Sequence, residues 1–277
     1  MRHYLRLGWT FARRSGFLLT LLFLYQFAWG LAILSWVKDT AVPILHRYPG
    51  GELPEASVRL FWLEAEFQLT KTPLAEPYIR TFLLLLLARM LFTPLLNAGI
   101  CSVLCASGKE SARRAFFAGV RRHAGRFLML YGLQALLTFA PLAWAIPWAA
   151  ARIPEAFDWT EAAAVLLPLA AGWFVWQGVL DLVFLYAGFG VAGGTGAARG
   201  AAAFARRALP AAAVALAVFG VSFAVSAAVS ALSLWQAGWI AFAVHQAYPL
   251  VRALLKLWGI GAQFRLWETA GPETVRT

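Results

Sequence analysis

Residues 209–234 read LPAAAVALAVFGVSFAVSAAVSALSL and contain no charged side chain. A helix rises 1.5 Å per residue, so a helix of this length can cross the ~30 Å of hydrocarbon in a bilayer. Inside lipid the backbone must satisfy its own hydrogen bonds, and a single segment does so only as a helix. The stretch therefore predicts a transmembrane helix and makes the chain an integral membrane protein.

Five further apolar blocks accompany this one. Of the 277 residues, 61% are hydrophobic and 13% are charged, whereas soluble domains are roughly half apolar and about a quarter charged. We therefore expect an all-α fold, a polytopic membrane helix bundle that forms a single transmembrane domain over residues 1–277. The sixth block is the weakest, because Pro249, Arg252 and Lys256 interrupt it, although long basic side chains near a helix end can reach the interface. The predicted spans are 16–37, 78–104, 127–151, 162–189, 209–234 and 239–258, with an outer loop at 38–77.

Basic residues alternate from one inter-span segment to the next. Segments 1–15, 106–126, 189–208 and 252–277 hold 17 of the 24 Lys and Arg residues, whereas 38–77 and 152–161 hold five bases against nine acids. An excess of Lys and Arg marks the cytoplasmic side of a membrane protein. The pattern predicts a multi-pass protein of the cell membrane with both termini in the cytoplasm. It also explains the net charge of +11 without nucleic acid as a partner.

Within the outer loop, Val58–Leu69 is rich in apolar residues. Its second half alternates like a strand, but Leu60, Leu63 and Phe67 also fit one face of a helix. Both interpretations stay open for this segment, either on the membrane surface or over the outer helix ends.

The basic segments share a spacing that suggests three copies of one unit. In each, a single arginine precedes an arginine pair by seven residues, which is nearly two helical turns, so the bases share a face. We expect three amphipathic helices at the inner interface, over 3–14, 111–122 and 197–207, with arginines toward anionic lipid headgroups and aromatic residues toward acyl chains. The alternative is that topology alone clusters the arginines. The residues are Arg6, Arg13 and Arg14, then Arg114, Arg121 and Arg122, then Arg199, Arg206 and Arg207.

The arrangement of spans and basic linkers also resembles that of a known group of proteins. The six spans, the linker AFFAGVRR at 115–122 and the run Gly99-Ile100-Cys101-Ser102 before Gly108-Lys109 resemble bacterial six-span membrane proteins of unknown function. These include the membrane region attached to some glycerophosphoryl diester phosphodiesterases. No counterpart of the soluble phosphodiesterase domain is seen, so the resemblance implies a membrane role and not that activity.

Charged and polar side chains within the spans are candidates for function, because burying them in hydrocarbon is costly. Arg89 lies near the middle of the second span, and Asn97 and Asp181 lie at similar depth in the second and fourth spans. We predict that these three form a buried polar cluster between neighbouring helices, and that Gln134 and Gln177 add polarity elsewhere. The cluster would either line a path for a substrate or ion, or hold the bundle together as a structural pair.

The sequence contains only weak matches to motifs that bind nucleotides or metals or carry out catalysis. Residues 188–193 match G-x-G-x-x-G, but the dinucleotide fingerprint needs a βαβ unit and an acidic residue about 20 positions later, and the next acid after Asp181 is Glu268. Cys101 and Cys105 share a helix face and are too few ligands for a metal site. Serines at 222, 226 and 230 form a small-residue stripe that suits close helix packing, with a polar conduit as the alternative. We therefore expect no catalytic residue, metal or cofactor.

Three classes of function remain open. The first is a non-enzymatic membrane protein that handles or senses a small molecule, lipid or ion. The second is a membrane scaffold or regulatory subunit with a protein partner. The third is an intramembrane or lipid-modifying enzyme, which usually needs converging acids, histidines or metal ligands that the spans lack. We favour the first.

Overall fold

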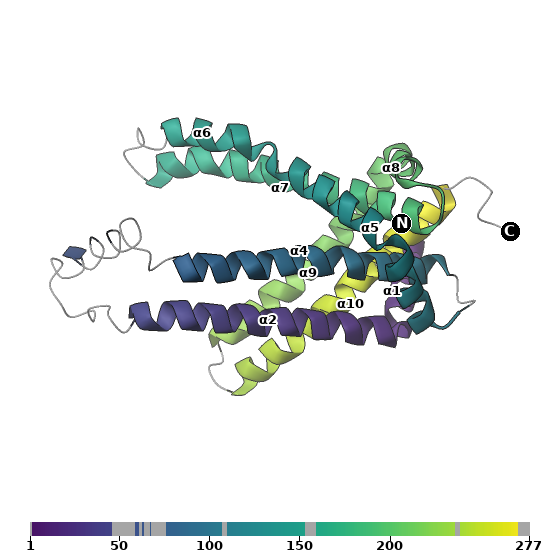
Figure 1. The fold of residues 1–277 in the computed structure, drawn as a ribbon, viewed down its shortest axis with the longest axis horizontal. Coiled ribbons are helices and arrows are strands. Elements are labelled where there is room, and N and C mark those ends of the chain that lie inside the picture. Colours follow the sequence, from purple (N-terminus) through teal and green to yellow (C-terminus); the bar gives the residue numbers. More distant parts are fainter. Residues whose placement is uncertain are drawn as a thin grey trace. The chain divides into compact units, whose positions relative to one another are not determined.

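The chain folds almost entirely into helices, shown in a computed structural model (Figure 1). The structure describes residues 2–45, 59–60, 63, 67, 76–106, 110–152, 159–235 and 239–270. These residues contain helices and no strand, which confirms the all-α prediction. The helices are α1 Arg2–Arg14, α2 Gly16–Leu45, α4 Glu76–Cys105, α5 Ala112–Phe139, α6 Leu142–Arg152, α7 Trp159–Ala192, α8 Ala197–Arg206, α9 Ala208–Trp235 and α10 Trp239–Ala270.

The helices divide into two compact units. The larger unit holds residues 1–20 and 93–277, and the smaller unit holds residues 21–92. In the smaller unit α2 and α4 are joined by Trp36, whose indole N–H donates to the Tyr78 carbonyl at 3.1 Å and whose ring contacts Phe82. The single domain over 1–277 stays a prediction. In the outer loop the described residues Leu60, Leu63 and Phe67 are helical, and the rest of Val58–Leu69 lies largely outside the described residues.

Five helical segments of the described chain are long and apolar enough to cross a membrane, and they match the first five predicted spans. The third of them is built from α5 and α6 together. The segments are Gly16–Thr40, Glu76–Cys105, Ala112–Arg152, Thr160–Ala192 and Ala208–Leu232. The first extends as helix α2 to Leu45, well into the predicted outer loop.

Proline explains why the third span is two helices. Pro141 has no backbone N–H, so the carbonyl of Leu137 loses the partner it would have in a continuous helix. In its place the indole N–H of Trp176 on α7 donates to that carbonyl at 3.0 Å. Trp173 donates likewise to the Thr138 carbonyl at 3.0 Å. The indoles thus satisfy backbone groups that the break exposes, and they fasten α5 to α7.

The sixth predicted span is helical but is not among these five apolar segments. It begins at Trp239 as predicted and continues to Ala270 rather than ending near 258. Its last turn returns to the start of α9, because Arg207, the residue before α9, donates from both guanidinium nitrogens to Thr269 at 3.0 Å. Helices α9 and α10 therefore form a hairpin (Figure 1).

Three short glycine contacts hold the basic segments against the even-numbered spans. A Cβ atom at Gly8 of α1 would lie 2.6 Å from the Ala262 nitrogen of α10. A Cβ at Gly119 of α5 would overlap the Ser102 side chain of α4, and one at Gly200 of α8 would overlap the Tyr186 carbonyl oxygen of α7. Each basic segment thus packs on the C-terminal part of a different long helix: α1 on α10, the start of α5 on α4, and α8 on α7. Glycine allows this close approach.

The three copies are not equivalent in detail. Segments α1 and α8 end before their spans, at Ser15 and Arg207, whereas the middle segment continues into α5 without a break. The docking glycine lies five residues before the arginine pair in the first copy, two before in the second and six before in the third. The spacing between the docking glycine and the arginine pair therefore differs among the three copies. Arg207 also differs from the other arginines, because it caps α10 instead of facing outward.

The core lies at the end of the larger unit where α1, α8 and the last turns of α10 meet, here called the packed end. Phe189 is fully buried and contacts the rings of Phe264 and Trp267. In the same region the buried Tyr186 hydroxyl donates to Gln263 at 2.9 Å, and Gln263 donates to the Ala211 carbonyl at 2.9 Å. This network links α7, α10 and α9.

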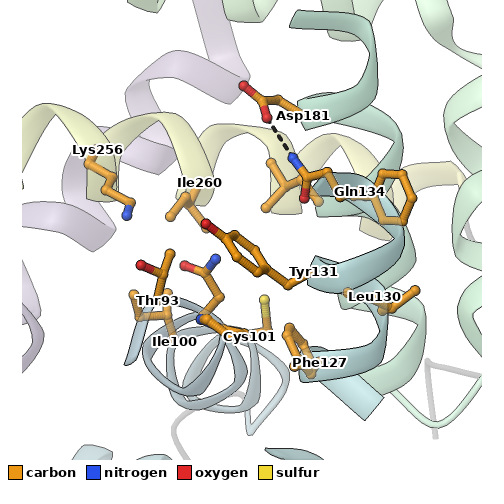
Figure 2. A pocket seen from close by; sticks show the side chains of 15 residues that line it. Thr93, Ile100, Cys101, Phe127, Leu130, Tyr131, Gln134, Asp181, Lys256 and Ile260 are labelled. Atoms are coloured by element: carbon orange, nitrogen blue, oxygen red, sulfur yellow. Dashed lines mark hydrogen bonds between the residues drawn. The ribbon is translucent and has the colours of Figure 1, made fainter. Parts of the chain in front are cut away.

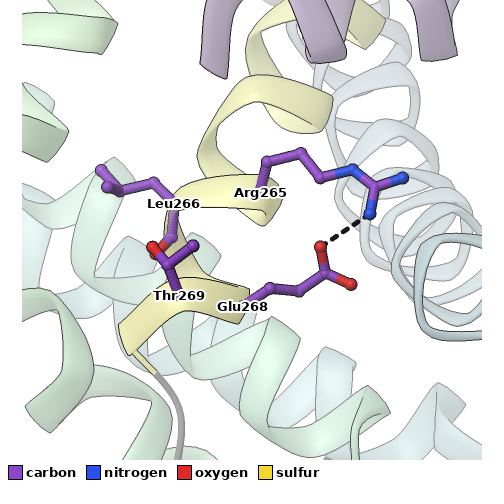
Figure 3. Close-up of polar contacts among 4 residues, drawn as sticks. All are labelled: Arg265, Leu266, Glu268 and Thr269. Carbon is purple, nitrogen blue, oxygen red and sulfur yellow. Dashed lines mark hydrogen bonds and ion pairs between the residues drawn. The ribbon is translucent and has the colours of Figure 1, made fainter. Parts of the chain in front are cut away.

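The last turn of α10 carries an ion pair. Arg265 and Glu268 are 2.7 Å apart, and the Thr269 hydroxyl donates to the Leu266 carbonyl at 2.8 Å (Figure 3). Both charged side chains are partly exposed, so water screens the attraction and this pair contributes little to stability. Arg207 and the Thr269 hydroxyl donate hydrogen bonds to backbone carbonyls in this last turn, of Thr269 and Leu266 respectively.

Candidate functional site

A cavity of about 320 Å³ opens within the larger unit, between α4, α5, α7 and α10. We call it the Asp181 cavity. Hydroxyl, amide, carboxylate and ammonium groups line it together with apolar side chains (Figure 2). Asp181 lies eleven residues before the end of α7 at Ala192, ~16 Å along the helix axis. The polar lining residues are Thr93, Asn97, Tyr131, Gln134, Asp181 and Lys256.

Asp181 is held by a neighbouring amide. Gln134 on α5 donates to the carboxylate at 2.6 Å (Figure 2), a short distance typical of a charge-assisted hydrogen bond. Gln134 was expected to add polarity elsewhere, and that expectation is wrong. The close packing of α5 on α7, with Trp173 and Trp176 bound to α5, brings the two side chains to the same depth.

Lys256 supplies the positive charge of the cavity. It extends from α10, and its ammonium attracts the Asp181 carboxylate across the space. Figure 2 shows the Lys256 amine and the Tyr131 hydroxyl pointing into the same region. Sequence reasoning treated Lys256 as a base near a helix end. This position was missed because α10 continues for nearly four turns beyond Lys256, to Ala270, so that Lys256 lies well inside the helix.

The predicted cluster is partly assembled. Asn97 and Asp181 line the same cavity. Helices α4 and α7 are neighbours near their C-terminal ends, since a Cβ at Gly188 would lie 3.9 Å from the Cys101 sulfur. Arg89 belongs to the smaller unit, so its pairing with Asp181 stays a prediction. The partner that the structure gives Asp181 is Gln134.

The arrangement suits reversible binding of a small polar species. A carboxylate, an ammonium and neutral donors converge on one space in a region where charges are costly unless compensated. Cys101 lines the cavity and packs against Gly188, as expected of a small packing residue. Among the described residues, no three His, Cys, Asp or Glu side chains gather as metal ligands would.

Comparison with protein family models, with curated proteins and with solved structures finds no match to this chain. Function is therefore inferred from the geometry of its own residues.

Proposed function

We propose that this chain is a non-enzymatic, multi-pass protein of the cell membrane that binds a small polar molecule or ion in the Asp181 cavity, for transport or for sensing. The observation that carries the proposal is the carboxylate of Asp181, bonded to Gln134, inside a cavity that Lys256 also lines. A pair serving only structure would be closed and dry, whereas these groups border 320 Å³ of space. Ligand sites are typically concave, mostly apolar and furnished with a few converging polar groups.

The exposed arginine side chains indicate which partners the protein would contact. Eight of the nine predicted interfacial arginines are exposed, and only Arg207 is half-buried. Exposed arginines on helices beside the spans suit contact with anionic lipid headgroups. A role as a scaffold or regulatory subunit is the alternative, in which a protein would contact the same basic faces.

Orientation can be tested by labelling. We expect cysteines introduced at Gly51 and Asp158 to react with an impermeant reagent added outside intact cells, and a cysteine at Lys109 to react only after lysis. These three positions lie outside the described residues, and the expectation rests on the partition of basic residues. Native Cys101 and Cys105 would first be replaced by alanine. A tag after Thr277 should be reached only after lysis. Labelling of Lys109 in intact cells would reverse the orientation.

Ligand binding is tested with purified protein in nanodiscs. A panel of small cations, anions and zwitterions is screened for a rise in melting temperature, and the best compound is titrated. Because a hydrogen bond to a charged group contributes ~1.5–3 kcal/mol, Asp181→Asn or Lys256→Gln should weaken binding about tenfold or more. Uptake into proteoliposomes then separates transport from sensing.

Two matched variants serve as controls. Gln177→Leu changes a polar residue of α7 that does not line the cavity, and Arg252→Gln removes a positive charge of α10 that does not line it. Both should keep the affinity of the native protein within about twofold, well under the tenfold step of 1.4 kcal/mol. The proposal fails if no class of compound raises the melting temperature, or if Asp181→Asn binds as tightly as Gln177→Leu.

A further inference from the structure

A second cavity, of about 250 Å³, lies in the larger unit where the end of α4 meets the start of α5. We call it the His123 cavity. It is separate from the Asp181 cavity, with which it shares no lining residue. Its polar lining consists of Ser102 on α4, Glu110 before α5, and Arg122 and His123 on α5.

His123 is the unusual member of this set. Its side chain is 9% exposed, and its Nδ1 atom has no hydrogen-bond partner among the described residues. Buried polar atoms nearly always have a partner, and leaving one unpaired is costly. His123 lines the cavity, so a group that binds there lies beside the imidazole ring.

The other two basic segments show that packing does not demand a histidine here. His123 lies four residues after the docking glycine Gly119, on the same helix face. The corresponding positions are Ala12 in α1 and Phe204 in α8, and Ala12 is fully buried without a polar atom in its side chain. A buried imidazole in only one of three similar contacts points to binding.

Charges of both signs border the cavity. Arg122 is exposed, and its charge acts on the neighbouring His123 ring. Glu110 contributes a carboxylate, which would repel a simple anion. The Ser102 hydroxyl already donates to the Ala98 carbonyl at 2.8 Å, so it can still accept a hydrogen bond. Arginine binds phosphate oxygens through two donors, and a carboxylate binds an ammonium.

We propose that the His123 cavity binds the headgroup of a phospholipid that carries a primary ammonium, such as phosphatidylethanolamine. Arg122 and the Nδ1–H of His123 donate to the phosphate, and Glu110 and Ser102 accept from the ammonium. A lipid is favoured over free phosphate because α5 continues directly from this cavity into a span.

The test measures which lipids the full-length protein retains. Protein purified in detergent is mixed with phosphatidylethanolamine, phosphatidylcholine or phosphatidylglycerol of matched chains, and bound lipid is counted by native mass spectrometry. Phosphatidylethanolamine should be retained about tenfold more strongly than phosphatidylcholine, whereas phosphatidylglycerol, which the exposed arginines also attract, should be lost equally in Arg122→Gln and Arg121→Gln. Phosphatidylcholine has no N–H to donate to Glu110, and phosphatidylglycerol has no cation to offset it.

Variants separate the site from general attraction to lipid. Arg122→Gln should reduce retention of phosphatidylethanolamine about tenfold, whereas Arg121→Gln removes the same charge from the adjacent residue, which does not line the cavity, and should leave retention unchanged. His123→Phe, which places the residue of α8 at this position, should also lose the lipid, while circular dichroism confirms its folding. Equal retention of phosphatidylcholine and phosphatidylethanolamine overturns the assignment, as does equal loss of phosphatidylethanolamine in both arginine variants. Displacement of the lipid by millimolar inorganic phosphate alone would show a free-anion site instead.

Discussion

Gly200→Ala is expected to lower the free energy of unfolding by ~1–3 kcal/mol, the usual cost of forcing extra atoms into a packed contact. A Cβ at this position would overlap the Tyr186 carbonyl oxygen and lie 3.0 Å from the Ala187 Cα. These are backbone atoms, which cannot rotate aside as a side chain can. Helix α8 must therefore move away from α7, and the contact between Tyr186 and Phe204 is lost with it.

The control is another glycine in the same fold. Gly220 lies in α9, and a Cβ there meets nothing within 4 Å, so Gly220→Ala should leave stability unchanged or raise it by up to ~1 kcal/mol through helix propensity. Gly8→Ala should also destabilise the protein, because its Cβ would lie 2.6 Å from the backbone nitrogen of Ala262 in α10, which cannot rotate aside. Thermal unfolding in a mild detergent measures all three. Equal melting temperatures for Gly200→Ala and Gly220→Ala would show that α8 is not docked as described.

The spans could be predicted from the sequence because a membrane imposes one strong requirement. Long uncharged runs must be helices in lipid, so the predicted starts at 16, 78, 209 and 239 fall within two residues of the observed starts of α2, α4, α9 and α10. The end of α10 was missed by twelve residues. Beyond Lys256 the helix is stabilised by packing on α1 at Gly8 and by Arg207, contacts between distant segments that local hydropathy does not contain.

The polar cavity was predicted in part for the same reason. Asp181 stands out as the lone acid of an apolar run, and counting residues from the helix ends places Asn97 at its depth. Gln134 and Lys256 were misplaced because depth alone does not say which helix faces which. The rotation of α5 toward α7 depends on Trp173 and Trp176 bonding to carbonyls near Pro141. A tryptophan pair opposite a proline break is a signal that could have indicated this pairing.

Gln263→Leu is expected to destabilise the larger unit by ~2–4 kcal/mol, since it leaves the buried Tyr186 hydroxyl without a partner at ~1–3 kcal/mol and removes the additional hydrogen bond to the Ala211 carbonyl at ~0.5–1.5 kcal/mol. Gln263 is 3% exposed and Tyr186 is fully buried. The amide accepts from the Tyr186 hydroxyl and donates to the Ala211 carbonyl, both at 2.9 Å. Leucine fills similar space but does neither. Unfolding by denaturant in mixed micelles measures the loss.

A double-mutant cycle identifies the cause. Tyr186→Phe removes only the hydroxyl and should cost ~1–2 kcal/mol, because it leaves one amide oxygen unpaired. In the double variant Tyr186→Phe, Gln263→Leu neither of these groups remains, so its cost should fall at least ~1 kcal/mol below the sum of the single costs, outside the ~0.5 kcal/mol expected of independent sites. Additive costs would mean that the two side chains act separately.

Asp181 gives the opposite expectation. An asparagine at this position still borders open space and still offers an oxygen that accepts from Gln134, so Asp181→Asn should change the free energy of unfolding by less than ~1 kcal/mol while it reduces ligand affinity. A polar group retained for binding and one retained for folding would thus be distinguished within a single helix, α7.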